Sequence, residues 1–416
     1  MSGRAWFRSS SGAATDARDK SSKLAPDKIL TIGCPVDCTI IDYLAKQRAS
    51  FADEPLNEVD SLVLSTISYY RFEHGALGRT VPTEVVPLPV AICGISHEEM
   101  YGGIWLSHMG GDEFLAAVLA SPRFMDLQVG YYANDVSSHF EKQFSAMTFF
   151  LPDDTIYIAF RGTDNSLAGW KEDFNLTFME EVPSQISART YLEDIADTHA
   201  SPLFVGGHSK GGNLAEYAVL TCRDQTFEKV VSVFNHDGPG FAFTPSERLG
   251  MPAYDAKLRK TVPESSIFGM LMEDRTCYRV VQATGVLFTQ HASTRWAVEE
   301  NGFVALDHIS SEAEIISSTL NNWAKSYEPG KRELFIDAVY DIFCAANAET
   351  LTKFAENPTG SALAVASAVT KLPSDMRSTL IEMIGGIAPI IGVETAKKAK
   401  DKLRLEATSA IEAPTQ

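Results

Sequence analysis

The chain has 416 residues, of which 45% are hydrophobic and 22% are charged, and its formal net charge at pH 7 is −18. This is the composition of an ordinary soluble globular protein, and the length fits one large α/β domain with additions, or two domains. The field of an acidic chain does not attract nucleic acid or an anionic membrane, so we expect neither as a partner. A local basic patch stays compatible with this charge.

The two ends of the chain and its cysteines indicate a cytoplasmic protein. Residues 1–28 are rich in Ser, Ala, Lys and Arg without an apolar core, which predicts a disordered segment and no secretory signal peptide. The apolar run 384–393 is too short to span a bilayer, so we expect no integral membrane contact. Of six cysteines only Cys34 and Cys38 are close, which is a poor metal signal. We expect reduced, mostly buried thiols and no metal or cofactor.

The first half of the chain predicts helices followed by a hairpin. Apolar residues recur at helical spacing over 39–46 and 58–72, which indicates N-terminal helices packed on the core. Residues 74–98 are rich in Gly, Pro and Val and predict a loop. The β-prone segments 143–151 and 155–160 flank a Pro-Asp-Asp turn, as in a hairpin.

The central region alternates helices and strands. Helices are predicted over 166–178 and 183–199, and buried strands over 203–205, 228–235 and 277–283. This alternation indicates an α/β domain over 29–326, with a mainly parallel sheet and helices on both faces. Residues 241–275 carry Gly, Pro and Ser and predict an irregular insertion near the site. Residues 327–416 predict a helical C-terminal extension. We expect the chain to form a homo-oligomer through these helices.

A G-x-S-x-G pentad, Gly207-His208-Ser209-Lys210-Gly211, lies between an apolar strand and a helical pattern. A serine on such a strand-to-helix turn is the nucleophile elbow of α/β-hydrolase enzymes. The turn is tight, so the flanking positions must be small, and glycine suits them. The alternatives are a glycine-rich loop capping an ordinary helix, or a phosphate loop, whose G-x-x-x-x-G-K-[ST] spacing is lacking.

A serine nucleophile needs a histidine base, and in this fold the order along the chain is serine, acid, histidine. Three histidines follow Ser209. His291 lies in a loop soon after the last predicted strand and is the expected base. His308, beside the next predicted helix, is the alternative, and His236 should point away from its neighbour Asp237. A surface or helix-capping role stays open for His291 and His308.

The expected acid is Asp237, which ends a β-rich segment and precedes a Gly-Pro-Gly turn that holds a carboxylate rigidly. The other candidates, Asp255, Glu264 and Asp274, lie in the irregular insertion and are weaker. The alternative for Asp237 is a turn-forming aspartate that bonds its own backbone.

An oxyanion hole is expected from the backbone N–H of Lys210 and an N–H of the loop Gly162–Thr163, with the Thr163 hydroxyl as a further donor. Arg161 and Asp164 are expected to pin this loop by an ion pair. The Lys210 side chain is expected to point to solvent or to a carboxylate on a neighbouring helix. Thr163, the pentad serine, its acid and its base all lie at or past the carboxyl end of a predicted strand, where reacting groups meet in such a sheet.

Several ordered motifs resemble those of class 3 lipases and, more closely, the Mbeg-like family of bacterial proteins. They are QFSA (143–146), FRGTD (160–164), GWKEDF (169–174), GGHSKGGNLAEYA (206–218), DGPGF (237–241), SSIFGML (265–271), QH (290–291) with Trp296, and NEVDSLVLS (57–65). The resemblance covers roughly residues 39–326. It implies an α/β-hydrolase fold and a lipase-like serine hydrolase site.

One segment departs from the class 3 lipase pattern. Those lipases place their acid in an Asp-Ile-Val-Pro segment shortly before the histidine, whereas here Ser265–Phe268 has no acid at the matching place. The acid must then come from elsewhere, and the position after the earlier strand, Asp237, is one that some lipases use.

These observations predict an intracellular serine hydrolase of the esterase or lipase type. It would cleave a small-molecule or lipid-like ester through an acyl-enzyme on Ser209, with Asp237 and His291 completing the triad. Two alternatives stay open. One is a non-catalytic binding or scaffold protein on a hydrolase fold. The other is an acyltransferase or peptidase that uses the same triad.

Overall fold

A computed structural model describes residues 38–79, 83–102, 106, 109–164, 166–345, 369 and 372–383. The predicted disordered segment 1–28, the apolar run 384–393 and Cys34 lie outside the described residues. The predicted division into the domain 29–326 and the extension 327–416 stays a prediction.

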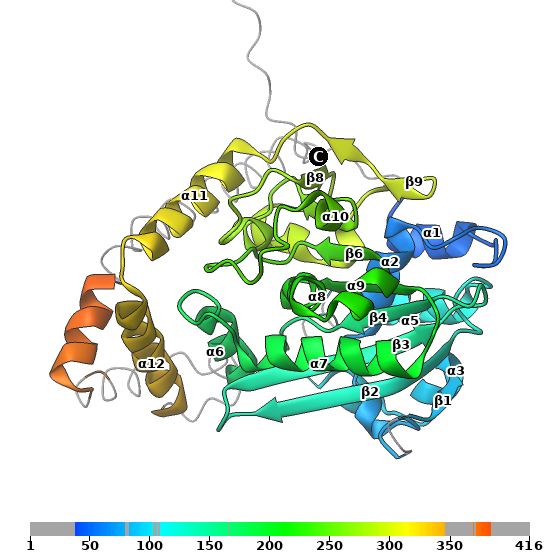
Figure 1. Cartoon of the computed structure of the whole chain (residues 1–416), viewed down its shortest axis with the longest axis horizontal. Helices are drawn as coiled ribbons and strands as arrows, with labels where there is room; N and C mark the ends of the chain where they lie inside the picture. The colour runs from blue at the N-terminus through cyan, green and yellow to red at the C-terminus, as the bar shows by residue number, and fades with distance from the viewer. Residues whose placement is uncertain are drawn as a thin grey trace, which may run out of the picture. The chain divides into compact units, whose positions relative to one another are not determined.

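The core of the protein is a nine-stranded mixed sheet with the strand order β1-β2-β3-β4-β5-β6-β7-β8-β11 (Figure 1). Its strands are β1 (Val85–Pro87), β2 (Gln128–Ser137), β3 (Lys142–Phe150), β4 (Ile156–Phe160), β5 (Leu203–His208), β6 (Val230–His236), β7 (Leu258–Pro263), β8 (Tyr278–Val281) and β11 (Ala305–Leu306). Neighbouring strands from β4 to β8 pair in parallel, whereas the flanking pairs are antiparallel. The short strands β9 (Val298–Glu299) and β10 (Gly302–Phe303) form a separate pair.

Helices surround this sheet. They are α1 (Ile40–Lys46), α2 (Glu58–Ile67), α3 (Leu88–Ile92), α4 (His97–Tyr101), α5 (Gly111–Ala120), α6 (Leu167–Asn175), α7 (Pro183–Thr198), α8 (Lys210–Thr221), α9 (Asp224–Lys229), α10 (Pro252–Asp255), α11 (Ser311–Lys325) and α12 (Pro329–Ala345). Short 3-10 turns are η1 (Phe72–His74), η3 (Phe268–Met270), η4 (Leu287–His291) and η5 (Ser293–Arg295). Residues 374–383 are also helical.

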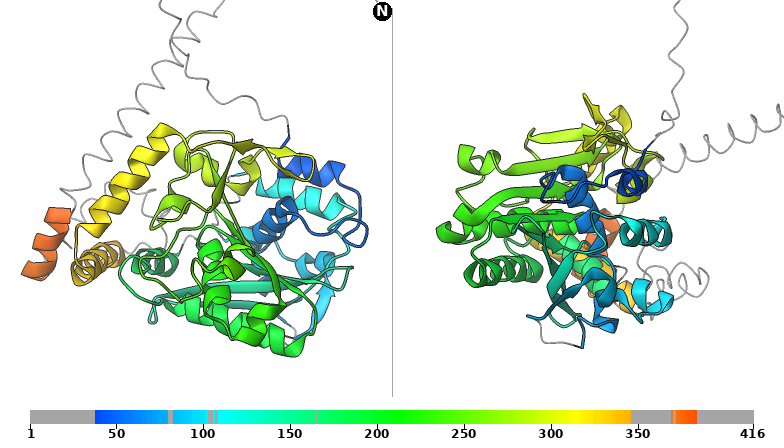
Figure 2. Two further views of the ribbon diagram at one scale, coloured as in Figure 1. Left: turned by 45° about the horizontal axis from the view of Figure 1, so that its top comes forward. Right: turned by 90° about the vertical axis from the view of Figure 1, so that its right-hand side faces the viewer.

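Side chains of β4 show how the sheet is buried on both faces. Ile156, Ile158 and Phe160 pack into one hydrophobic core with residues of α7 and α8. Tyr157 and Ala159 point to the opposite face, into a second core with residues of α1, α2 and α5. Successive side chains of a strand alternate between faces, so a parallel strand covered on both sides is apolar throughout. The views in Figure 2 show the helices that supply these two layers.

The N-terminal helix α2 begins where the sequence predicts a helix. The side chain of its N-cap residue, Asn57, accepts hydrogen bonds from the amides of Val59 and Asp60, and the Asp60 carboxylate accepts one from the Asn57 amide. This reciprocal cap satisfies amides that the first helical turn leaves unpaired. The Asp60 carboxylate also pairs with the buried Arg123 guanidinium at 2.7 Å, which ties α2 to the body of the domain.

Two segments that were expected to be loops contribute to the sheet. Residues 74–98 contain β1, α3 and the start of α4. Residues 241–275 contain α10 and β7, which lies between β6 and β8. The prediction of an irregular insertion is therefore wrong for β7. Its sequence, LRKTVP, does not read as a buried strand because it contains a lysine. The Lys260 side chain is nevertheless fully buried, since Glu273 neutralises its charge at 2.6 Å.

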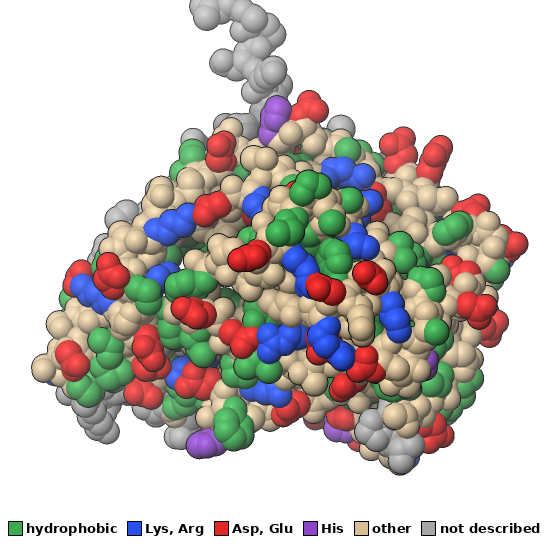
Figure 3. All heavy atoms as spheres, viewed as in Figure 1, with side chains coloured by type: hydrophobic (Ala, Val, Ile, Leu, Met, Phe, Trp, Pro, Cys, Tyr) green, Lys and Arg blue, Asp and Glu red, His purple; other side chains and the backbone are tan. Residues whose placement is uncertain are grey.

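The surface and the cysteines test further expectations. The five described cysteines are free thiols, but only Cys222 is buried, so the expectation of mostly buried cysteines is wrong for the described residues. Among the described helices, none combines the length and apolar character needed to cross a bilayer. Acidic and basic side chains are interspersed on the face shown in Figure 3, so the acidic excess is not gathered there.

Candidate active site

Ser209 lies on the sharp turn between β5 and α8. Its backbone has φ 59° and ψ −134°, a positive φ that non-glycine residues rarely adopt. A Cβ atom at Gly207 would lie 2.2 Å from the carbonyl carbon of Gly211, and one at Gly211 would lie 2.1 Å from the Phe160 oxygen. Both pentad glycines are therefore required by close backbone approach, which is the geometry of a nucleophile elbow.

Asp237 and His291 form a direct pair. Asp237 follows β6 with φ 56°, and its Oδ2 lies 2.6 Å from Nδ1 of His291. Its other oxygen, Oδ1, accepts hydrogen bonds from the Ser266 hydroxyl at 2.5 Å and from the Gly269 amide at 3.2 Å. The Asp237 side chain is fully buried and that of His291 is 17% exposed. A buried carboxylate held in this way fixes the imidazole with Nε2 free for proton transfer.

The segment 265–271, which lacks an acid at the position used by class 3 lipases, contacts the candidate acid Asp237 that follows β6. Ser266 and Gly269 both donate to Asp237, and a Cβ at Gly269 would lie 2.3 Å from Oδ1 of this aspartate. Phe268 between them places its ring 4.5 Å from the His291 ring. Sequence reasoning missed these supporting roles, although the SSIFG motif that carries them was visible.

Gln290, which precedes the base, joins the His291 loop to this segment. Its Oε1 accepts from the Ser265 amide at 2.8 Å, and its backbone oxygen accepts from the Trp296 indole at 3.0 Å. In the QH motif, Gln290 therefore fixes the loop of the candidate base His291 to the segment that holds Asp237.

His208 contacts His291, the candidate base, through both its ring and a hydrogen bond. Its Nε2 lies 2.7 Å from the His291 carbonyl oxygen, and its ring lies 4.5 Å from the His291 ring. Because Nε2 faces a carbonyl it must carry the proton, so Nδ1 accepts from the Tyr69 hydroxyl at 3.0 Å. Burial, and then the nearby His291, lowers the pKa of His208 well below its usual value. His208 is therefore neutral and positions the base without competing for its proton.

Ser209 opens into an apolar cavity of about 520 Å³. The walls come from α6, the η3 segment, α11, α12 and the helical residues 374–383. They include Leu167, Trp170, Phe174, Leu176, Phe268, Leu271, Leu320, Trp323, Phe335, Ile336, Val339 and Met383. Among the described residues, no hydrogen bond joins the Ser209 hydroxyl to His291. Such catalytic bonds are often long without substrate and tighten in the complex.

The oxyanion donors differ in part from expectation. The amide of Lys210 opens α8, where first-turn amides have no partner inside the helix, and Lys210 lines the cavity. The Thr163 hydroxyl instead donates to Oδ2 of Asp173 at 2.6 Å, so it is occupied and is not directed at the cavity. Arg161 and Asp164 form the expected ion pair, at 3.3 Å.

The Lys210 side chain does not reach solvent. It is 1% exposed, and its ammonium donates to the backbone oxygen of Gln143 at 3.1 Å, to Gln143 Oε1 at 2.7 Å and to Glu172 at 3.1 Å. The predicted contact with a carboxylate on a neighbouring helix is found, since Glu172 belongs to α6. This pair anchors α6 against the start of α8.

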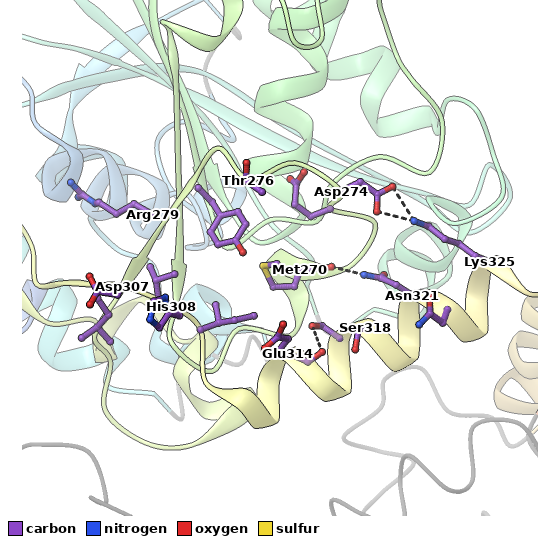
Figure 4. Close-up of a pocket in the computed structure, with 17 residues that line it drawn as sticks. Met270, Asp274, Thr276, Arg279, Asp307, His308, Glu314, Ser318, Asn321 and Lys325 are labelled. Carbon is purple, nitrogen blue, oxygen red and sulfur yellow. Dashed lines mark hydrogen bonds and ion pairs between the residues drawn. The ribbon is translucent and has the colours of Figure 1, made fainter.

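The imidazole rings of the other candidate histidines are engaged elsewhere, although the backbone oxygen of His236 accepts from the Ser209 amide at 2.9 Å. His236 is buried between the Ser61 hydroxyl at 2.8 Å and the Thr261 hydroxyl at 2.9 Å, and burial lowers its pKa to about 3. His308 is exposed and lines a polar pocket between α11 and the edge of the sheet, as Figure 4 shows. Neither histidine ring contacts Asp237, in contrast to that of His291.

The weaker acid candidates also take other roles. Asp274 lies beside the same polar pocket and pairs with Lys325 at 2.8 Å (Figure 4). Asp255 is exposed, and Glu264 accepts from Gln290 Nε2 at 3.1 Å. Among the described residues, no group of three or more His, Cys, Asp or Glu side chains could hold a metal ion. The absence of a cofactor stays a prediction.

The sheet order, the strained serine between β5 and α8, and the acid after β6 define an α/β-hydrolase fold. The Mbeg1-like family model matches residues 118–341, which is more than half of the chain, and the chain belongs to this family. No curated protein sequence gives a significant match. Among solved structures, the crystal structure of M37 lipase is similar, with 15% identity and a TM-score of 0.32 over 50% of this chain and 68% of that chain.

Proposed function

We propose that this protein is a serine hydrolase of the esterase or lipase type that cleaves carboxylic esters through an acyl-enzyme on Ser209. The observation that carries the proposal is the 2.6 Å contact between Asp237 and His291, next to a serine on a strained elbow. A turn-forming aspartate would bond its own backbone, whereas Asp237 gives one oxygen to an imidazole and the other to a dedicated serine and amide.

The geometry supports a two-step acyl transfer. Ser209 Oγ attacks the ester carbonyl carbon while His291 Nε2 takes its proton, and Asp237 stabilises the resulting imidazolium. The carbonyl oxygen becomes an oxyanion that accepts from the Lys210 amide and from an amide of the loop Gly162–Thr163. The intermediate collapses, and the alkoxide leaves with the proton from His291. Water then attacks the acyl-enzyme with His291 again as base.

The apolar cavity indicates the kind of ester. Its aromatic and aliphatic walls would bury a hydrocarbon chain, and its volume lies in the range of about 300–1,000 Å³ typical of small-ligand sites. A small-molecule or lipid-like ester with an apolar acyl chain therefore fits. An acyltransferase or peptidase would use the same triad, and the cavity does not distinguish them.

A non-catalytic binding protein is the second candidate. The observation that favours it is the lack of a hydrogen bond between Ser209 and His291 among the described residues. In this case the apolar cavity would bind a ligand without turning it over.

Labelling with a fluorophosphonate probe tests the proposal. We expect wild-type protein to be labelled at Ser209, located by peptide mass spectrometry. Ser209→Ala should not be labelled. Asp237→Asn should react about 10⁴-fold more slowly, because the amide no longer orients the base or stabilises its cation.

Circular dichroism and unfolding midpoints serve as controls for the two variants. If folded wild-type protein takes no label, the serine is not activated, and a non-catalytic binding function would then explain the cavity better than hydrolysis. If Asp237→Asn is labelled at the wild-type rate, the acid has been assigned wrongly.

A further inference from the structure

The cavity that Ser209 opens into is lined by three cationic side chains, and two of them are neutralised. Lys210 is held by Glu172 and Gln143. Lys171 pairs with Glu141 at 2.6 Å and with Asp337 at 2.9 Å. These lysines therefore bring little uncompensated charge into the cavity.

Arg332, on α12, is the third cation and has no carboxylate partner within ion-pair distance among the described residues. Its Nη1 donates to the backbone oxygen of Thr177. Its Nε is buried without a hydrogen-bond partner. Glu328, one turn earlier, acts on it only at longer range, and burial lowers the pKa of Arg332.

The Arg332 side chain is partly buried against apolar walls, which weakens its hydration and favours a counter-charge. The adjoining cavity residues are apolar, among them Leu176, Phe335 and Ile336. Burying a charge without a partner is unfavourable, and proteins usually retain one only where something compensates it. Among the described residues no carboxylate forms an ion pair with Arg332, so its guanidinium is able to pair with a negatively charged group of a bound ligand.

We propose that Arg332 is the anion-binding element of the Ser209 cavity, so that the ester it accepts carries a carboxylate or phosphate group at a distance from the scissile bond. The inference rests on the proposed function and narrows its substrate class to anionic amphiphilic esters. Guanidinium suits this task because it is weakly hydrated and offers a planar set of donors to carboxylate and phosphate oxygens.

The one acidic cavity residue favours the same orientation. Asp173 lines the cavity together with Ser209, lies 3.7 Å from the Lys210 ammonium and is not paired with Arg332. A carboxylate there repels a second anion from the reacting end of the cavity. The anionic group of the substrate is thus kept away from Ser209 and placed at Arg332, which leaves the uncharged ester for the triad.

Three p-nitrophenyl octanoates of equal chain length test the proposal: the plain ester, one with a terminal carboxylate and one with a terminal phosphate. The readout is the ratio of kcat/KM for each anionic ester to that for the plain ester. We expect Arg332→Gln to lower this ratio about tenfold to a hundredfold, the usual effect of losing a charge-assisted hydrogen bond. Lys331→Gln removes one charge from the same turn of α12 outside the cavity and should leave the ratio unchanged.

The esters with a terminal carboxylate and a terminal phosphate show which anionic group Arg332 binds. A drop confined to one ester supports the proposal and names carboxylate or phosphate as the group. Equal ratios in wild type and Arg332→Gln, or equal drops in the two charge variants, would overturn it.

A binding measurement separates this inference from the proposed function. Ser209→Ala protein, which cannot form an acyl-enzyme, is titrated calorimetrically with octanoate, octyl phosphate and octanol. We expect at least one anion to bind tenfold or more tightly than octanol, and the preference to vanish when Arg332→Gln is added. If the anions bind this way but wild type hydrolyses no ester, the proposed function fails and the anion site stands. If esters are hydrolysed and the anions bind no better than octanol, only the anion site fails.

Discussion

Burial changes the chemistry of Asp173, which lies on α6 beside the nucleophile. Its Oδ1 is buried without a hydrogen-bond partner, while Oδ2 accepts from Thr163. Loss of hydration outweighs the attraction of the nearby Lys210 and raises the pKa of Asp173 to about 6. The Thr163 hydroxyl is held by this carboxylate, so in the proposed mechanism the oxyanion would be bound by backbone amides alone.

The raised pKa of Asp173 predicts how stability depends on pH. The folded protein holds this proton more tightly than the unfolded chain, so the ionised form opposes folding. Its destabilising effect is absent below the ordinary pKa near 4 and grows as pH rises through 6. Asp173→Asn, which can still accept from Thr163, should therefore be more stable than wild type at pH 8 by about 1 kcal/mol, a value reduced for the partly exposed side chain.

Urea unfolding of both proteins at pH 4.5 and pH 8 measures this difference. The difference in unfolding free energy between the two proteins should be small at pH 4.5, where only part of the effect has developed, and larger at pH 8. The exposed Asp126→Asn is the matched control and should follow wild type at both pH values. Parallel curves for wild type and Asp173→Asn would contradict the assignment.

At the scale of residues, the sequence pointed to the candidate triad but not to the residues that hold its members in place. Ser209, Asp237 and His291 follow from a local pentad and a fixed order along the chain, and the structure brings the last two into contact. The bonds from Ser266 to Asp237 and from Tyr69 to His208 join residues 29 and 139 positions apart, which no local pattern reports. Thr163 was misjudged because its hydroxyl has a competing acceptor on α6.

The helix α11 holds the segment that positions the acid. Asn321 donates through Nδ2 to the Met270 oxygen at 2.8 Å and accepts through Oδ1 from the Met272 amide at 2.9 Å. It thereby fixes the end of η3, two residues beyond Phe268. Asn321 lines both the apolar cavity and the polar pocket on the other side of α11.

Asn321→Ala tests this element. The substitution removes two hydrogen bonds of about 1 kcal/mol each, and the Gly269 amide that binds Asp237 loses its support. We expect kcat/KM for p-nitrophenyl octanoate to fall about tenfold, because small displacements of reacting groups are costly. Asn322→Ala, at the next and exposed position of α11, should stay within about twofold of wild type. Equal effects of the two variants would show that α11 does not position the acid.

Contacts between elements far apart in the sequence were not predicted, because no local sequence pattern reports which distant residues meet. The pattern of β7 is interrupted by Lys260, which is tolerated only because Glu273 neutralises it, 13 residues later. The helix α12 lies in the extension predicted as helical, but neither it nor α11 was predicted as a cavity wall. Their partners Phe174 and Phe268 lie more than 40 residues earlier in the chain. Homo-oligomer formation through the C-terminal helices stays a prediction.

The charge of the whole molecule opposes the ligand that we infer for it. The chain carries 54 acidic and 36 basic residues, and its net charge of −18 creates a field that repels anions at long range. Arg332 acts inside a half-buried site, where salt screens charges less than it does on an exposed surface. The long-range repulsion and the short-range attraction should therefore respond differently to ionic strength.

A salt series separates these two effects. Raising KCl from about 20 to 200 mM shortens the Debye length from roughly 20 to 7 Å, which screens the repulsion and leaves most of the Arg332 contact. We expect kcat/KM for the ester with a terminal carboxylate to rise about two- to fivefold, while plain p-nitrophenyl octanoate, measured alongside, stays constant. In Arg332→Gln the rise should persist at a lower absolute rate, since the net field is still acidic. A fall of kcat/KM with salt for the anionic ester would mean that an exposed basic surface, and not the cavity arginine, attracts the substrate.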